Sequence, residues 1–155
     1  MIWGDTMLTT LVDEAGVPPA FVIVARDVSE RRRQEAALID EALTDPPTGL
    51  LNRRGVAARV APWLDEARAG KALTISAWAL EIDFFKRVND RHGHDGGDVV
   101  LRHLGQLLTP QFRRGDIVAR LVGEEFVVLL REASAAFAMA AAERARHVLE
   151  HAPLV

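Results

Sequence analysis

Hydrophobic and polar positions follow two different periods along this chain. Residues 6–12 and 20–27 are rich in strand-forming residues, and the Asp-Glu-Ala-Gly segment 13–16 between them has turn chemistry. The pattern predicts an N-terminal β-hairpin. Because an isolated hairpin is marginal in water, this hairpin needs a partner surface or belongs to a larger domain.

A helix is predicted directly after the hairpin. Ser29 is a favourable N-cap, and residues 30–43 contain neither Gly nor Pro. Ala36, Ile39 and Leu43 follow the 3-then-4 spacing of a coiled-coil seam, although an ordinary amphipathic linker shows the same pattern over two turns. The Asp-Pro-Pro-Thr-Gly segment that follows ends this helix.

From residue 52 onward, helical and strand periods alternate. Asn52 can cap a helix that runs to about Ala69, with Pro62 as a kink, and Leu73–Ile82 is apolar enough for a strand covered on both faces. The later segments are expected to be a loop, a helix, two strands and a helix, at 83–97, 98–112, 117–121, 126–130 and 135–150. This order predicts an α/β domain, a layered sheet with helices on its faces.

Composition narrows the class of protein. The chain has 155 residues, of which 49% are hydrophobic and 26% charged, enough for one globular domain with a short appendage. A net charge of -3 argues against a general nucleic-acid or membrane-surface binder. The chain has no cysteine, no signal-peptide pattern and no apolar run near the roughly 18 residues of a membrane span. We therefore expect a cytoplasmic protein.

Carboxylates lie at the ends of the predicted strands. Glu81 and Asp83 end one strand, and Glu124 and Glu125 lie at the tip of the second hairpin. If these strands are neighbours, Glu81 and Glu124 converge with a backbone carbonyl, which are the hard oxygen ligands that Mg²⁺ prefers. The alternative is that these acids are simply solvated, as is common at strand ends.

The segment after the first of these strands has phosphate- and base-binding chemistry. Phe84 and Phe85 anchor the turn, whose backbone N–H groups can hold phosphate oxygens, and at least one of the two rings is expected to be ordinary core. Lys86 can neutralise phosphate charge. Asn89 carries both a donor and an acceptor, which suits a base edge.

Two further polar segments allow alternative readings. The His- and Asp-rich segment 91–98 matches no standard zinc spacing, so a glycine-rich nucleotide loop is favoured over a zinc site. Asp98 at the expected helix start can bind guanine, cap the helix, or do both. Arg113 and Asp116 can grip phosphate and a guanine edge, or form a solvated turn.

In this order, the motifs resemble the GGDEF family of diguanylate cyclases. The Gly-Gly-Asp/Glu-Glu-Phe signature stands here as Val122-Gly123-Glu124-Glu125-Phe126, preceded by Arg120. Other segments that match the family are 43–54, 82–86 and 89–98. The resemblance covers roughly residues 43 to 151, while 6–33 resemble the last two strands of a PAS sensor domain and the start of a signalling helix.

The resemblance implies an enzyme that condenses two GTP molecules into cyclic di-GMP, a bacterial second messenger, with release of pyrophosphate. Glu81, the Ile82 carbonyl and Glu124 would bind Mg²⁺ or Mn²⁺. Glu124 or Glu125 would help deprotonate the attacking hydroxyl, and Lys86 would stabilise phosphate charge. The residues implied in substrate binding are Phe84, Phe85, Asn89, His94, Asp98 and Gly123.

The resemblance also implies a regulated homodimer in which each domain holds one GTP. Arg113 and Asp116 match the family's RxxD product-inhibition site. The expected division is a sensor-domain hairpin at 1–28, a dimerisation helix at 29–44, and a GGDEF domain at 45–155 that lacks the family's closing strands.

Two departures from the family pattern favour an alternative function. Val122 replaces a glycine at a hairpin tip, where a positive φ would strain a β-branched residue by about 1–3 kcal/mol. Glu81 replaces an aspartate, and about 1 Å of misplacement can cost about 10²-fold in rate. The alternatives are a catalytically degenerate module that binds GTP or cyclic di-GMP, or a gene fragment.

Overall fold

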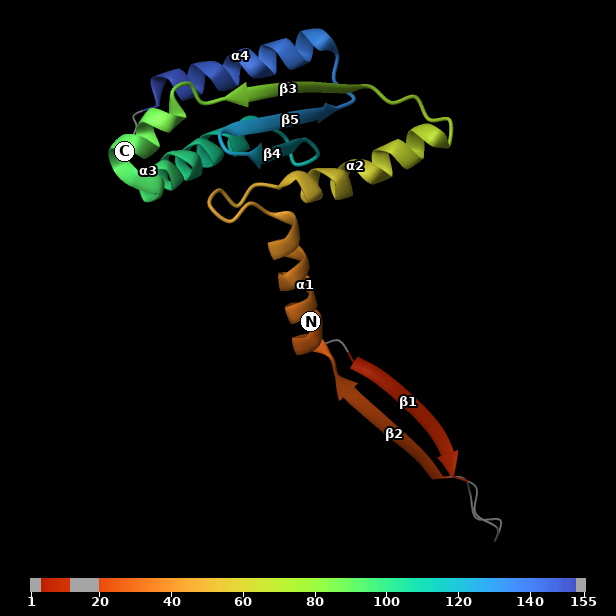
Figure 1. Ribbon diagram of the computed structural model, residues 1–155. Coiled ribbons are helices and arrows are strands. Elements are labelled where there is room, and N and C mark those ends of the chain that lie inside the picture. Colours follow the sequence, from red (N-terminus) through yellow and green to blue (C-terminus); the bar gives the residue numbers. More distant parts are fainter. Residues whose placement is uncertain (1–3, 12–19, 153–155) are drawn as a thin grey trace. The chain divides into compact units, whose positions relative to one another are not determined.

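The computed structural model describes residues 4–11 and 20–152, which belong to two compact units, Met1–Asp40 and Glu41–Val155. In the first unit, β1 (Gly4–Leu11) pairs antiparallel with β2 (Ala20–Asp27), as Figure 1 shows. The two strands predicted at this end of the chain are therefore confirmed. The turn predicted at 13–16 lies outside the described residues.

Helix α1 (Ser29–Leu43) follows β2 directly. The Asp27 carboxylate accepts a hydrogen bond from the Ser29 backbone N–H at 2.8 Å, and bonds from Ser29 hold the pKa of Asp27 below its usual value. Ser29 is thus the first helical residue, and the prediction that Ser29 is the N-cap was wrong. Asp27 takes the capping role because its carboxylate accepts from a backbone N–H of the first turn, where N–H groups have no carbonyl of a preceding turn to bond.

The second unit is a three-stranded antiparallel sheet with helices on both faces (Figure 1), which confirms the predicted α/β class. The strand order is β3-β5-β4, and β5 pairs with both neighbours. The elements are α2 (Arg53–Arg68), β3 (Ile75–Glu81), α3 (Phe85–Leu108), the short 3-10 helix η1 (Thr109–Gln111), β4 (Ile117–Val122), β5 (Glu125–Arg131) and α4 (Ala135–His151).

The period-2 pattern of β5 builds the core on both faces of this sheet. Phe126, Val128 and Leu130 are fully buried on the face that α3 and α4 cover. Val127 and Leu129 pack on the opposite face, in the cluster around Trp63 of α2. Full burial of such a side chain contributes about 1.5–3 kcal/mol. The burial of Phe126 therefore holds the signature segment, which spans the end of β4 and the start of β5, at a defined end of the sheet.

The loop expected at 83–97 is mostly helix. Helix α3 already begins at Phe85, and only Gly93, with φ 71° and ψ 175°, departs from helical geometry inside it. The prediction that Asp98 starts a helix and caps it was therefore wrong. The glycines lower helix propensity, but Gly97 is buried against Phe85, so tertiary packing outweighs propensity here.

Candidate functional site: a polar cavity at the signature hairpin

Strands β4 and β5 join through a two-residue tip. Val122 pairs with Glu125 across the ladder, and Gly123 has a φ of 55°. Among the non-glycine residues of the described ranges, only Phe84 and Glu132 have a positive φ. The strain expected at Val122 is therefore absent, because the left-handed position of the turn falls on Gly123. Val122 is instead an exposed residue at the end of β4.

Three acidic residues lie at this end of the sheet. Strands β3 and β5 are antiparallel neighbours, as anticipated, and Glu81 lies opposite Glu125 in the register. Glu124 precedes Glu125 at the hairpin tip. Glu81 and Glu125 are exposed, whereas Glu124 is half-buried. The strands are therefore neighbours as predicted, with Glu125 rather than Glu124 directly opposite Glu81, and the convergence of Glu81 and Glu124 on one metal ion stays a prediction.

A cavity of about 400 Å³ opens beside the tip, between the hairpin and α3. Its lining residues are Phe85, Lys86, Asn89, Asp90, His94, Asp98, Leu101, Arg120, Gly123 and Glu124. Most of the residues predicted to bind substrate are therefore gathered around one space. Glu81, Ile82, Phe84 and Glu125 were also predicted as site residues, but they are not among the described residues that line this cavity.

Helix α3 supplies two walls of the cavity from either side of its break at Gly93. Lys86 and Asn89 come from the part before the break, and His94 and Asp98 from the part after it. Gly97 lets these two parts pack closely, because a Cβ at this position would overlap the Asn89 amide oxygen and lie 3.1 Å from the Phe85 ring. The break and this close packing place hydrogen-bond donors and acceptors from both parts of the helix around the same cavity.

The two phenylalanines after β3 have different roles. Phe85 is buried in the core and also borders the cavity, so the expectation that at least one ring is core is confirmed. Phe84 is exposed and left-handed, with φ 59° and ψ 25°. Such a conformation costs a bulky residue on the order of 1–3 kcal/mol and marks functional turns. The left-handed conformation of Phe84 thus turns the chain from the C-terminal end of β3, at Glu81, into the start of α3.

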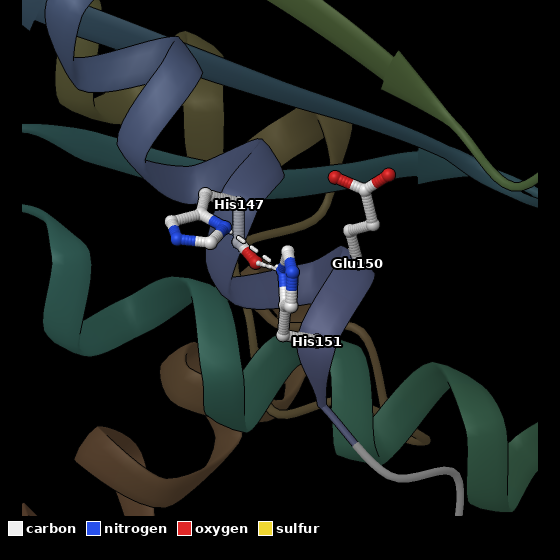
Figure 2. A group of neighbouring side chains, drawn as sticks. All are labelled: His147, Glu150 and His151. Atoms are coloured by element: carbon white, nitrogen blue, oxygen red, sulfur yellow. Dashed lines mark hydrogen bonds between the residues drawn. The ribbon is translucent and has the colours of Figure 1, made fainter.

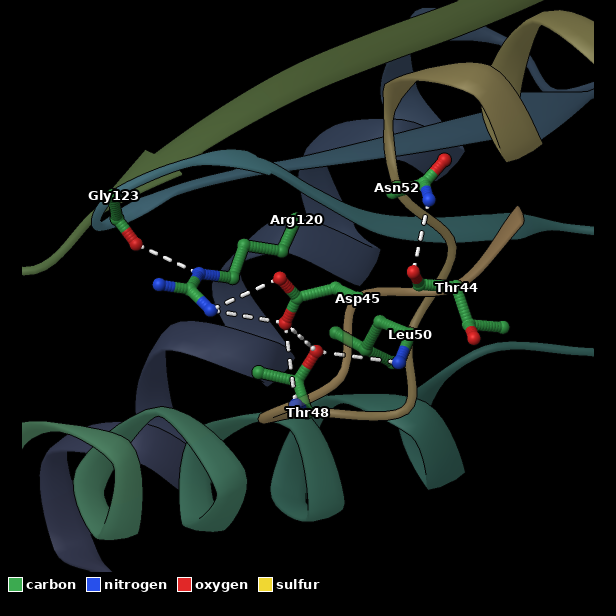
Figure 3. A network of polar contacts seen from close by, with 7 residues as sticks. All are labelled: Thr44, Asp45, Thr48, Leu50, Asn52, Arg120 and Gly123. Atoms are coloured by element: carbon green, nitrogen blue, oxygen red, sulfur yellow. Dashed lines mark hydrogen bonds and ion pairs between the residues drawn. The ribbon is translucent and has the colours of Figure 1, made fainter. Parts of the chain in front are cut away.

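Arg120 is a lining residue that sequence reasoning recorded only as the residue ahead of the signature. Figure 3 shows its guanidinium between the hairpin tip and a loop after α1. Its Nε donates to the Gly123 carbonyl at 2.7 Å, and its Nη1 donates to Asp45 Oδ1 and Oδ2 at 3.1 and 3.0 Å. The side chains of Arg120 and Asp45 are only 12% and 18% exposed. A charged residue in an otherwise apolar strand needs a partner of opposite charge. The single arginine in the apolar segment 117–122 was therefore the sequence signal that could have predicted a buried ion pair.

Asp45 also organises its own loop. Its Oδ2 accepts from Thr48 Oγ1 at 2.7 Å and from the Thr48 backbone N–H at 3.2 Å. Beyond the loop, Asn52 donates to the Thr44 carbonyl at 2.8 Å and caps α2 through Gly55, which confirms the predicted cap. The start of the second unit and the tip of the hairpin therefore belong to one polar network.

Arg113 and Asp116 lie away from the cavity, in the turn before β4. Arg113 Nε contacts Asp116 Oδ1 at 3.3 Å, and Arg113 Nη2 donates to the Arg131 carbonyl at 3.0 Å. This turn and the signature tip lie at opposite ends of β4, roughly 20 Å apart at about 3.3 Å per residue. The pair thus lies apart from the cavity, with an exposed Arg113 side chain and an Asp116 side chain that is only 4% exposed.

Sequence comparison identifies relatives of the second unit. The family described as "Diguanylate cyclase, GGDEF domain" matches residues 42–154. The response regulator PleD of Caulobacter vibrioides is 39% identical over 115 residues, which are 74% of this chain and 25% of PleD. The diguanylate cyclase DgcM of Escherichia coli is 38% identical over 145 residues, which are 94% of this chain and 32% of DgcM. The chain thus spans about a quarter to a third of these relatives.

Solved structures show the same fold. The coiled coil and GGDEF domain of DgcB from Caulobacter crescentus, crystallised with c-di-GMP, aligns with a TM-score of 0.69 and 27% identity. That alignment covers 76% of this chain and 61% of DgcB. Diguanylate cyclase SiaD from Pseudomonas aeruginosa, in complex with its activator SiaC, aligns with a TM-score of 0.64 and 35% identity over 80% of this chain and 49% of SiaD. The chain belongs to the GGDEF family of diguanylate cyclases.

Proposed function

We propose that this chain is a diguanylate cyclase domain that condenses two GTP molecules into cyclic di-GMP and pyrophosphate, in bacterial second-messenger signalling in the cytoplasm. The observation that carries the proposal is the cavity itself. It gathers a lysine, an amide, three acids and a glycine of the signature hairpin around a space of about 400 Å³. Relatives named diguanylate cyclases cover up to 94% of this chain.

The guanine base would lie against α3. Asn89 offers a donor and an acceptor, and the Asp98 carboxylate can accept from the N1 and N2 donors of guanine, with His94 close by on the same wall. The Asp98 side chain is free to do this because Asp98 does not cap a helix. Lys86 would face the phosphates, and Gly123 would leave space for them beside the tip.

Cyclases of this family generally use a divalent metal ion, and the acids at the sheet end fit Mg²⁺ or Mn²⁺. Glu81 and Glu124 would supply carboxylate oxygens, with the Ile82 carbonyl as a further oxygen ligand. The Ile82 carbonyl accepts a long 3.4 Å bond from the Phe85 N–H, and a carbonyl oxygen has a second lone pair that can bind a metal ion. A divalent ion there would neutralise charge on the GTP phosphates.

Catalysis would require two copies of the domain. Each 3′-hydroxyl attacks the α-phosphate of the other GTP, the bond to pyrophosphate breaks, and Glu124 or Glu125 takes the hydroxyl proton. Helix α1 is the proposed dimerisation element, because Leu38 and Ile39 are 65% and 59% exposed on it. The hairpin β1–β2 would be the end of a sensor domain that acts through this helix.

A second candidate function is a binding module without turnover. It is favoured by Glu81, whose extra methylene shifts a metal-binding carboxylate relative to the family aspartate. It is also favoured by Arg113 and Asp116, which match the family's product-binding pair. In that case cyclic di-GMP would bind at the turn before β4 while the cavity stays inactive.

One experiment separates the two functions. The chain is incubated with GTP and Mg²⁺, the products are resolved by chromatography, and cyclic di-GMP binding is measured by calorimetry on the same preparation. Product formation that Glu124→Gln abolishes supports the cyclase. Binding without product, lost in Arg113→Ala, supports the binding module. Neither product nor binding would refute both.

A further inference from the structure

A cluster of metal-ligating side chains lies outside the cavity, at the exposed C-terminal end of α4. Figure 2 shows His147, Glu150 and His151 on neighbouring turns, and their nearest ligand atoms all lie within 4.8 Å of one another. We propose that this cluster binds one divalent transition-metal ion of the Ni²⁺, Cu²⁺ and Zn²⁺ class. The site is independent of the proposed cyclase activity.

Helical spacing explains why these residues converge. Positions three and four apart lie on one face of an α-helix, so His147, Glu150 and His151 project from the same side of α4. All three side chains are exposed, so an ion can reach them without unfolding the helix.

The spacing of the two imidazoles is close to that of ligands on one ion. His147 Nδ1 and His151 Nδ1 are 2.8 Å apart. Two nitrogens at about 2.0–2.1 Å from a metal lie about 2.9 Å apart at a right angle, and about 3.3 Å apart at a tetrahedral angle. The pair is thus nearly preorganised for the right-angled geometry that Ni²⁺ and Cu²⁺ adopt, and small side-chain shifts would suit Zn²⁺.

Binding requires three weak contacts to be exchanged, the first of which is the 2.8 Å hydrogen bond between His147 Nδ1 and His151 Nδ1. His151 Nδ1 lies 2.8 Å from the His147 backbone carbonyl and would leave it for the metal. Glu150 would leave Arg146, to which it is paired at 2.9 Å. Arg146 keeps its bidentate contact with Glu143, at 2.7 and 3.0 Å, so its charge stays compensated. Exposed ion pairs of this kind contribute little to stability, so the exchange costs little.

The donor set selects the class of ion. Imidazole nitrogens favour Zn²⁺, Cu²⁺ and Ni²⁺, whereas Mg²⁺ prefers oxygen ligands. A cation at the last turn of α4 also interacts favourably with the negative end of the helix dipole. A bound ion would link residues 147 and 151 across one turn, and Leu149 between them packs against the core. Metal binding should therefore stabilise the end of this helix.

The test is calorimetric titration of the untagged chain with NiCl₂, and separately with ZnCl₂, in a buffer with excess MgCl₂. The Mg²⁺ occupies acidic sites near the hairpin, so the signal reports the imidazoles. We expect one ion per chain and a rise in the melting temperature with Ni²⁺. Because losing an outer partner of a metal ligand costs about 10–100-fold in affinity, His151→Ala should cost at least that much.

Two variants serve as matched controls. His92→Ala removes an exposed histidine of α3 outside the cluster and should bind Ni²⁺ like the wild type. Glu150→Gln should weaken binding less than either histidine change, since two nitrogen ligands remain. Circular dichroism confirms that each variant folds. Unchanged Ni²⁺ affinity in the double variant His147→Ala/His151→Ala would refute the proposal, as would one ion per two chains with Ni²⁺-dependent dimerisation.

Discussion

At the scale of single residues, Gly97 shows how one absent methyl group shapes the cavity. A Cβ there would overlap the Asn89 amide, so Gly97→Ala should displace Asn89 and weaken GTP binding about tenfold, a loss of about 1.4 kcal/mol. Calorimetry with GTP measures this. Gly115→Ala is the matched control, because nothing lies within 4 Å of a Cβ at that position. Equal GTP affinity in both variants would mean that Asn89 does not contact the nucleotide.

Val122 is the second residue with a clear expectation. Since Val122 lies in a strand without positive φ, Val122→Gly relieves no strain and adds backbone freedom. Urea denaturation should show a loss of stability of about 0.5–1 kcal/mol. Any effect on turnover should be smaller than that of Glu124→Gln, because Val122 does not line the cavity. A gain in stability would contradict the backbone geometry described at the tip.

At the scale of elements, the Asp45–Arg120 pair connects the loop after α1 to the hairpin. Asp45→Asn leaves a mostly buried guanidinium without a charged partner, which should cost about 1–3 kcal/mol in stability. Turnover should also fall, because Arg120 holds the Gly123 carbonyl at the tip. The control is Asp65→Asn, which breaks only an exposed pair with Arg68 and should change neither quantity. Equal melting temperatures in both variants would show that the network is not structural.

Helix α2 is tied to β5 by a second ion pair with a pH signature. Hydrogen bonds from Arg131, and then from Lys71, hold the pKa of Glu66 below its ordinary value. A carboxyl group whose pKa is lower in the folded than in the unfolded state stabilises the fold at pH values above its unfolded-state pKa. This stabilisation is lost as the pH falls through the folded-state pKa. Acid unfolding of Glu66→Gln should therefore be less steep than that of the wild type below about pH 4.5. An unchanged profile would mean that the pair contributes nothing.

These elements also show how far sequence reasoning reached. The pattern of apolar residues correctly predicted the two strands around the signature, and the residue type at Asn52 correctly predicted the helix cap. The first half of α3 was not predicted, because Gly93, Gly96 and Gly97 lower helix propensity, and the close packing at Gly96 and Gly97 cannot be seen in the sequence. The partner of Arg120 lies 75 positions away in the chain, at a separation that no local pattern encodes.

At the scale of the whole molecule, turnover should depend on association through α1. Ile39→Asp places a charge on the exposed apolar stripe and should shift the chain towards monomer in light scattering. Cyclic di-GMP formation should fall in parallel, since in the proposed mechanism each copy supplies one GTP. Ala37→Asp adds a charge at an exposed position about 160° around the helix from Ile39 and is the control. Full activity of a monomeric Ile39→Asp protein would refute the dimeric mechanism.

The break at Gly93 has a consequence for how fast the cavity exchanges its contents. The helical part before this glycine forms one wall of the cavity, and the part after it forms another. A modest change in two backbone angles at Gly93 alters the gap between Asn89 and Asp98 while each helical part stays intact. We therefore expect the residence time of a nucleotide bound there to depend on the two backbone angles at Gly93.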